Sequence, residues 1–229
     1  MKAARCRMVT MVTAGVLAAA GVQAAPTVGE CMELTTGIKF SKNNGDAQVN
    51  VEETFEGKKL KGTQLILDGG VLLATSYQDI RDGQVFLTGT VHYNEDGTVR
   101  SKNVYAPQSA IPAKMRAGQE VRVQFTDTQT STHYPLAGLS DKITTSTRTD
   151  KRDFSITFLG WERLELGGRR FPDACKFELR DVGGKSKGKS GEYVWYAQGY
   201  GVIMTDKLDQ DGDVQPAYRI ALTKIISTP

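Results

Sequence analysis

The sequence predicts an all-β protein, a curved antiparallel sheet or half-open barrel of about ten strands in hairpin succession. From Val49 onward, short runs of alternating apolar and polar residues are separated by turn signals, most of which contain glycine. Helical periodicity is not sustained for three turns in this region. A sheet of about ten strands tends to curl or close, because open twisted sheets rarely grow larger.

The stretch from Gly191 to Asp206 carries the strongest strand signal, with aromatic and β-branched residues on both sides of a glycine pair. One face of the expected strand carries Tyr193, Trp195 and Ala197, and the other carries Val194 and Tyr196. Both faces therefore need cover from other parts of the protein. Gly199 and Gly201 then permit a bend or bulge that directs the chain into residues 202–205.

The other alternating runs predict a strand at each of their positions. In chain order these lie near residues 49–55, 63–67, 71–77, 85–93, 98–105, 121–125, 154–158, 161–166, 175–179 and 218–222. Turns such as Glu56-Gly57 and Arg81-Asp82-Gly83 mark hairpins between them. In the run 175–179 the apolar positions place Cys175 on the core side.

Two segments lack this pattern. Pro107 and Pro112 bracket residues 108–111, and because proline removes a ladder donor we expect a connection between strands there. Residues 126–149 are rich in Ser and Thr and poor in apolar residues. They are expected to form either a long mobile loop or a polar edge hairpin.

Residues 1–24 are predicted to be a cleaved secretory signal peptide, and residues 25–229 a single all-β domain. Lys2, Arg5 and Arg7 precede an uncharged run over residues 8–21, and small residues lead to a cleavage site after Ala24. The apolar run is shorter than the roughly 20 residues of a membrane span, so we expect no transmembrane span. The mature protein should be exported, with the periplasm favoured over the extracellular space.

Charge argues against polyanionic partners. The chain carries 29 basic and 26 acidic residues, and Lys2, Arg5 and Arg7 account for the whole formal excess of +3. The mature chain is therefore formally neutral and has no overall basic field that would attract nucleic acid or an anionic membrane surface. We accordingly expect no nucleic-acid partner.

Three cysteines are present, and Cys6 leaves with the signal peptide. Cys31 and Cys175 remain in a chain exported to an oxidising compartment, where a disulfide is favoured. Closing so long a loop would contribute roughly 5 kcal/mol in the chain-entropy model. The alternative is two unrelated buried thiols.

Residues 183–190, Gly-Gly-Lys-Ser-Lys-Gly-Lys-Ser, match the phosphate-binding pattern G-x-x-x-x-G-K-S. That motif requires a following helix whose N-terminus faces the phosphate, whereas residues 192–196 are strand-like. A flexible hairpin tip is the better interpretation, and we expect no nucleotide partner and no cofactor.

The remaining polar clusters do not indicate catalysis. Asp209, Asp211 and Asp213 offer too few ligands for calcium and predict a solvated Asp-Gly turn. His92 and His133 are the only histidines and lack a zinc-binding pattern, so we expect no metal and place His92 on a polar sheet face. Without a G-x-S-x-G elbow, no catalytic residues are predicted and the protein is not expected to be an enzyme.

Residues 195–203, Trp-Tyr-Ala-Gln-Gly-Tyr-Gly-Val-Ile, resemble the signature Trp-Tyr-Ala-x-Gly-x-Gly-hydrophobic of exported bacterial proteins of unknown function. Residues 171–176, Phe-Pro-Asp-Ala-Cys-Lys, resemble the element Gly-x-Phe-Asp-Ala-Cys-Lys that precedes it, with Pro172 interposed and Gly168 one residue too distant. The resemblance covers residues 161–206. It implies an architecture similar to periplasmic lipoprotein carriers, half-barrels whose concave face can hold an acyl chain.

The leading hypothesis is therefore a non-enzymatic envelope protein that binds a lipid or another hydrophobic small molecule. Trp195, Tyr196 and Tyr200 are the candidate pocket residues, because glycines beside large side chains let a ligand approach closely. The alternative is a structural or interaction module whose partner is an envelope protein; an enzyme comes third. A cavity lined by Leu, Val and aromatic residues would favour binding, and a filled core with exposed aromatic residues would favour the module.

Overall fold

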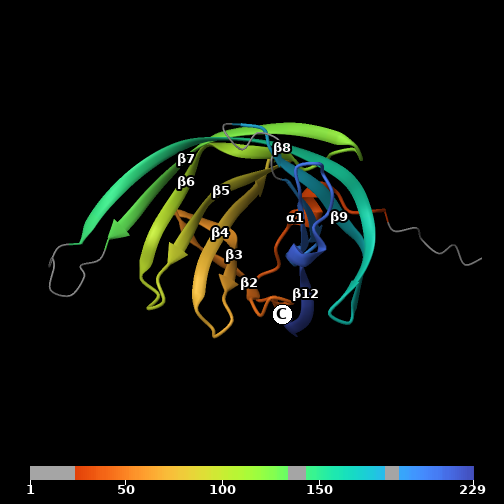
Figure 1. Ribbon diagram of the computed structural model, residues 1–229, viewed down its shortest axis with the longest axis horizontal. Coiled ribbons are helices and arrows are strands. Elements are labelled where there is room, and N and C mark those ends of the chain that lie inside the picture. The colour runs from red at the N-terminus through yellow and green to blue at the C-terminus, as the bar shows by residue number, and fades with distance from the viewer. Residues whose placement is uncertain (1–23, 134–142, 184–190) are drawn as a thin grey trace, which may run out of the picture.

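The computed structural model describes residues 24–133, 143–183 and 191–229, which form an almost entirely β structure (Figure 1). Two short helices are α1 (Val28–Met32) and the 3-10 helix η2 (Pro216–Tyr218). The strands are β1 (Lys39–Lys42), β2 (Ala47–Phe55), β3 (Lys58–Ile66), β4 (Leu72–Arg81), β5 (Gln84–Tyr93), β6 (Val99–Pro112), β7 (Gln119–His133), β8 (Thr144–Leu166), β9 (Arg169–Asp181), β10 (Gly191–Ala197), β11 (Gly201–Leu208) and β12 (Ile220–Ser227).

The described strands form one closed antiparallel barrel. Strands β2 to β12 pair with their sequence neighbours, and β1 lies between β12 and β2. The predicted all-β class and hairpin succession are confirmed. The predicted half-open barrel of about ten strands is corrected to a closed barrel of twelve strands in this part of the chain.

Closure depends on β1, which the alternating pattern does not reveal. The strand has four residues and only one apolar side chain, Phe40. Phe40 is fully buried, and its backbone pairs with Gln48 on β2 and with Ile225 on β12. A strand this short carries too little alternation to be distinguished from a turn, so its pairing was not predictable.

The expected connection between Pro107 and Pro112 is instead part of β6. The peptide bond between Ala106 and Pro107 is cis. Up to Ala106, β6 pairs with both β5 and β7. From Ser109 to Pro112, β6 pairs with β5 alone. The prolines are tolerated because this half of β6 has one neighbour and needs fewer donors.

The part of β7 that faces this half of β6 also pairs with only one neighbouring strand. Gln119 to Phe125 pairs with β8, whereas β6 pairs with β7 only from Thr126 to Ser131. Residues 107–112 of β6 and 119–125 of β7 are therefore not paired with each other, and we call this gap in the pairing the split. All of these residues belong to the described part of the chain.

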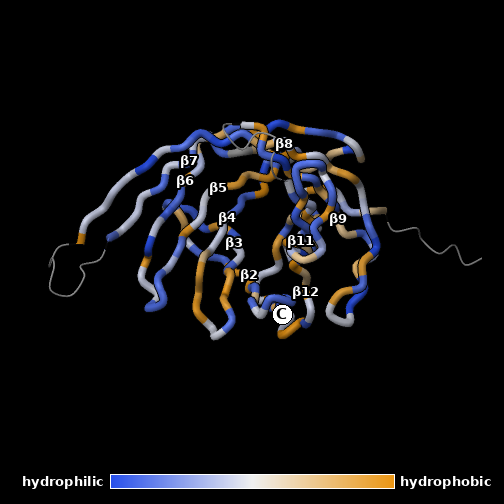
Figure 2. The backbone as a smooth tube through the Cα atoms, in the orientation of Figure 1, coloured by the Kyte–Doolittle hydropathy of each residue, from blue (hydrophilic) through white to orange (hydrophobic). Residues whose placement is uncertain are grey.

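As far as the structure describes it, the polar segment 126–149 forms a hairpin, but not the edge hairpin expected, because β6 pairs with Thr126 to Ser131. Thr126 to His133 continues β7 and pairs with Thr144 to Lys151 on β8, while β6 covers its other side. Residues 134–142 lie outside the described residues. Figure 2 shows that this arm is mainly hydrophilic.

The glycine pair after β10 closes a hairpin and does not bend a single strand. Gly199 and Gly201 have φ of +82° and +77°, and the Tyr200 amide donates to the Ala197 carbonyl at 2.9 Å. Glycine adopts these positive φ values without the steric cost that other residues pay. The chain therefore reverses into β11, which pairs with β10 from Gly201 onward.

Candidate functional site

Trp195 and Tyr200 belong to a filled core. They are only 2% and 4% exposed and pack in one cluster with Phe40, Phe171, Ile203 and Leu222. The Trp195 indole Nε1 donates to Glu162 Oε2 at 2.9 Å, and the Lys176 ammonium lies 4.7 Å from the Trp195 ring centroid. The indole N–H of Trp195 and the face of its ring therefore both have partners within the protein.

Tyr196 lies on the other face of β10, as alternation predicts. Its ring meets the edge of Phe177 at a centroid distance of 5.6 Å and packs against the cluster that contains Cys31 and Cys175. Burial raises the pKa of the Tyr196 hydroxyl to about 12, with a smaller contribution from Glu192. The three candidate pocket residues therefore lie in two different clusters.

Tyr200 also borders a surface cavity of about 410 Å³. Four charged side chains, Glu30, Arg169, Arg170 and Asp173, form part of its lining. The Arg169 guanidinium lies 5.1 Å from the Tyr200 ring centroid, in a cation–π contact. This cavity is unlike the apolar pocket expected at Tyr200.

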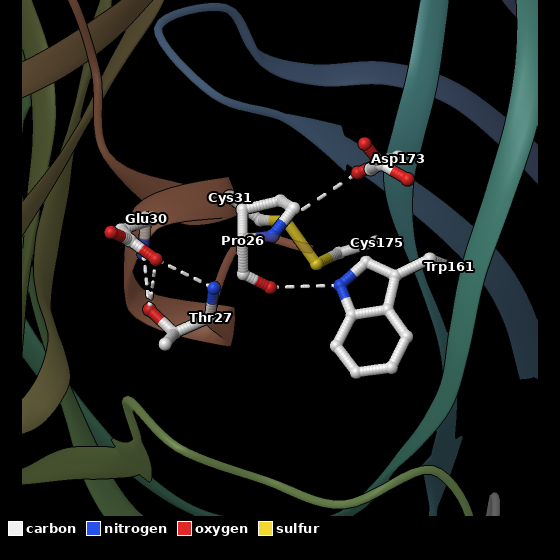
Figure 3. The surroundings of a disulfide bond; sticks show 7 residues. All are labelled: Pro26, Thr27, Glu30, Cys31, Trp161, Asp173 and Cys175. Carbon is white, nitrogen blue, oxygen red and sulfur yellow. Dashed lines mark hydrogen bonds between the residues drawn. A yellow bond between two sulfur atoms is a disulfide. The ribbon is translucent and has the colours of Figure 1, made fainter. Parts of the chain in front are cut away.

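A disulfide and a hydrogen bond, both between residues far apart in the sequence, tie the segment that contains helix α1 to strands β9 and β8 (Figure 3). Thr27 and Glu30 form a capping box, and the two hydrogen bonds from Thr27 lower the pKa of Glu30. Cys31 is joined to Cys175 on β9 in a disulfide with Cα atoms 6.0 Å apart. The Trp161 indole on β8 donates to the Pro26 carbonyl at 2.8 Å.

The anchored helix covers one part of the inner face. Its side chains Val28, Cys31 and Met32 are buried and share a cluster with residues from β5 to β9. That cluster includes Val85, Val123, Ile156, Phe158 and Phe177. The core-side placement predicted for Cys175 is confirmed, since it is fully buried.

Beside this core, the inner face continues as an apolar cavity of about 350 Å³. Val123 and Ile156 border both the helix-covered core and the cavity. Five further residues line the cavity with large side chains that are only half-buried: Leu87, Tyr105, Phe125, Phe154 and Leu179. Phe125 lies 4.8 Å from Tyr105 and 6.1 Å from Phe154 between ring centroids. The aromatic rings thus form one wall.

Polar and charged groups also line this cavity. Asp127 is 8% exposed and accepts a hydrogen bond from Asn103 Nδ2 at 2.8 Å, and Arg152 Nε lies 3.7 Å from its carboxylate. The Tyr105 hydroxyl lies 3.2 Å from Thr90 Oγ1, and burial raises its pKa. Glu192 from β10 also lines this cavity. A mainly apolar lining with a few polar groups suits a hydrophobic ligand that also carries a polar group.

The two histidines lie on a third, polar cavity of about 760 Å³. Burial, and secondly Arg100, lower the pKa of His92, which therefore stays neutral near pH 7. His133 Nε2 lies 2.9 Å from Ser146 Oγ. The part of the chain that the structure describes contains no group of three His, Cys, Asp or Glu side chains suited to a metal ion.

The remaining sequence motifs are placed as follows. In the phosphate-loop match only Gly183 is described; residues 184–190 lie outside the described residues, and strand β10 begins at Gly191. Asp209 forms the predicted turn, with its Oδ1 accepting from the amides of Asp211 and Asp213 at 2.9 Å each. No helix in the described residues has the length and apolar character of a membrane span.

Sequence reasoning missed the cavity, although part of its signal was present. Leu87, Phe125, Phe154 and Leu179 each occupy an apolar position of an alternating run. The registers bring them together, since Val123 pairs with Phe154 and Ile156 with Leu179. Alternation predicts which face of the sheet each residue occupies. It does not predict the position of the residue along the barrel axis, and that position decides which side chains α1 covers.

Comparisons with known proteins show no close relative. No family model matches the chain, and no curated protein matches it. Among solved structures it is similar to a predicted exported protein with a YmcC-like fold from Bacteroides fragilis, at 12% identity and a TM-score of 0.48, and to a predicted lipoprotein from Parabacteroides distasonis, at 12% identity and a TM-score of 0.34. Each alignment covers 89% of this chain and 100% of the other chain.

Proposed function

We propose that the mature protein is an exported binding protein that holds a hydrophobic ligand in the apolar cavity beside α1. The observation that carries this proposal is the set of five large, half-buried side chains that line the cavity: Leu87, Tyr105, Phe125, Phe154 and Leu179. Covering them would remove apolar surface from water, which favours binding by roughly 25 cal/mol per Å². The predicted signal peptide supports an envelope location, with the periplasm first.

A structural or interaction module is the second candidate. Trp195 and Tyr200, two of the three expected pocket residues, are buried in a filled core, while Trp161 and Tyr218 are 43% and 60% exposed. A filled core together with exposed aromatic residues favours a module. A structural module with a filled core does not require an apolar cavity, so the cavity favours the binding function.

Binding of a fluorescent apolar probe, N-phenyl-1-naphthylamine, tests the proposal. The parent chain should bind it, and Leu87→Trp should weaken binding at least tenfold because the larger side chain occupies the cavity. Leu67→Trp is the matched control, since Leu67 is exposed after β3 and lines none of the cavities described above. Absence of binding to the parent chain, or equal binding by both variants, would contradict the cavity as the site.

A further inference from the structure

The apolar cavity lies beside the split between β6 and β7. Phe125, the last residue of β7 before pairing with β6 begins, forms part of the cavity wall. On β6 the corresponding position is Pro107, where pairing with β7 has ended. At Tyr105 and Asp127, which also line the cavity, the two strands are still paired, whereas from Pro107 and Phe125 onward the barrel wall beside the cavity has no β6–β7 pairing.

A second cavity, of about 470 Å³, lies at the same place. We call it the outer groove. It is bordered by Pro107, by Lys151 and Asp153 on β8, and by two residues that also line the apolar cavity, Phe125 and Arg152. Lys151 and Asp153 alternate with Arg152 along β8, so they face the opposite side of the sheet. Phe125 and Arg152 thus lie between the inner apolar cavity and an outer groove whose lining is more polar.

The outer groove has an excess of positive charge. Asp153 is neutralised by Arg122, whose Nε donates to Asp153 Oδ1 at 2.7 Å, and Gln124 donates to the same carboxylate at 3.0 Å. Within the described residues, Lys151 has no carboxylate at ion-pair distance, and Arg152 lies 3.7 Å from Asp127, beyond hydrogen-bond range. Two incompletely paired cations therefore border the groove.

We infer that the ligand is a single-chain amphiphile with an anionic head group. Its apolar chain lies in the inner cavity, the molecule passes the split beside Phe125, and its head lies in the outer groove against Lys151 and Arg152. A volume of about 350 Å³ is at the small end of the roughly 300–1,000 Å³ typical of ligand sites, which suits one chain. This inference rests on the proposed function, because it specifies the ligand of the same cavity.

The test is displacement of the bound apolar probe from the full mature chain by dodecanoate, by uncharged dodecanol and by inorganic phosphate. Dodecanoate should displace the probe at about fivefold lower concentration than dodecanol, in keeping with exposed ion pairs, and this preference should shrink in high salt. Phosphate alone should not displace it. Lys151→Glu should weaken dodecanoate about fivefold and leave dodecanol unchanged.

Lys224→Glu is the matched control, because Lys224 is an exposed lysine on β12 that borders none of these cavities. Equal potency of dodecanoate and dodecanol, or an equal effect of Lys151→Glu and Lys224→Glu on dodecanoate, would overturn the inference while leaving the proposed function intact. Displacement by phosphate alone would also overturn it. If the probe does not bind the parent chain at all, the proposed function fails first.

Discussion

The carboxylate of Asp206 on β11 accepts two hydrogen bonds from the guanidinium of Arg219, from Nε and Nη2, each at 2.7 Å. The Asp206 side chain is 2% exposed, whereas half of Arg219 is exposed. Strands β11 and β12 share only two register pairs, Met204 with Ala221 and Thr205 with Ile220. The ion pair therefore reinforces the weakest seam of the closed barrel.

Replacing Arg219 with alanine should destabilise the protein by about 3 kcal/mol, because the buried carboxylate of Asp206 loses its partner. Chemical denaturation measures this change. Lys59→Ala is the control: its ion pair with Glu52 is exposed and should contribute less than about 1 kcal/mol. Equal effects of the two substitutions would show that the seam does not depend on this pair.

The disulfide between Cys31 and Cys175 should be present in the exported protein. Titration of unreduced, denatured material should find no free thiol, and two thiols per chain would disprove the bond. Reduction should destabilise the protein by roughly 2–5 kcal/mol, since α1 loses its covalent tie to β9.

Tyr200→Phe should stabilise the protein by about 1 kcal/mol, because it removes a buried hydroxyl that has no hydrogen-bond partner in the described residues. Tyr77→Phe is the contrast, since the Tyr77 hydroxyl donates to Glu53 Oε2 at 2.9 Å. It should cost roughly 1.5 kcal/mol. Thermal and chemical unfolding measure both; a loss of stability in Tyr200→Phe would mean that this hydroxyl has a partner in the working protein.

Alkaline titration tests the burial of Tyr196. Its folded-state pKa of about 12 exceeds the ordinary value of 10.0, so its contribution to stability is complete below pH 10 and is lost as the pH rises toward 12. The parent chain should therefore lose more stability than Tyr196→Phe across this window. Identical pH profiles for the two proteins would contradict the raised pKa of this hydroxyl.

Much of the barrel could be predicted because hairpins are local. Turn glycines and alternation place β2 to β5 in order, and the two faces assigned to β10 agree with the separate clusters that contain Trp195 and Tyr196. Barrel closure could not be predicted, because it depends on pairing Phe40 with strands near both ends of the chain. The prediction that residues 107–112 form a connection was wrong, because a strand can contain proline where it pairs with only one neighbouring strand.

The candidate site was harder to predict than the fold. The aromatic residues around Trp195 gave the strongest strand signal because they build a core, and burial of aromatic residues usually serves packing. The cavity instead depends on where a five-residue helix stops covering the sheet. That limit is set by long-range contacts such as the disulfide to Cys175 and the hydrogen bond from Trp161 to Pro26.

Native mass spectrometry of the mature chain, purified from its own envelope without delipidation, tests the central claim most directly. The parent protein should carry an added mass of one small hydrophobic molecule, released under denaturing conditions, and Leu67→Trp should carry the same mass. Leu87→Trp, in which the cavity is filled, should lack it. A parent chain that is always bare, or an added mass that persists in Leu87→Trp, would contradict a ligand site in the apolar cavity.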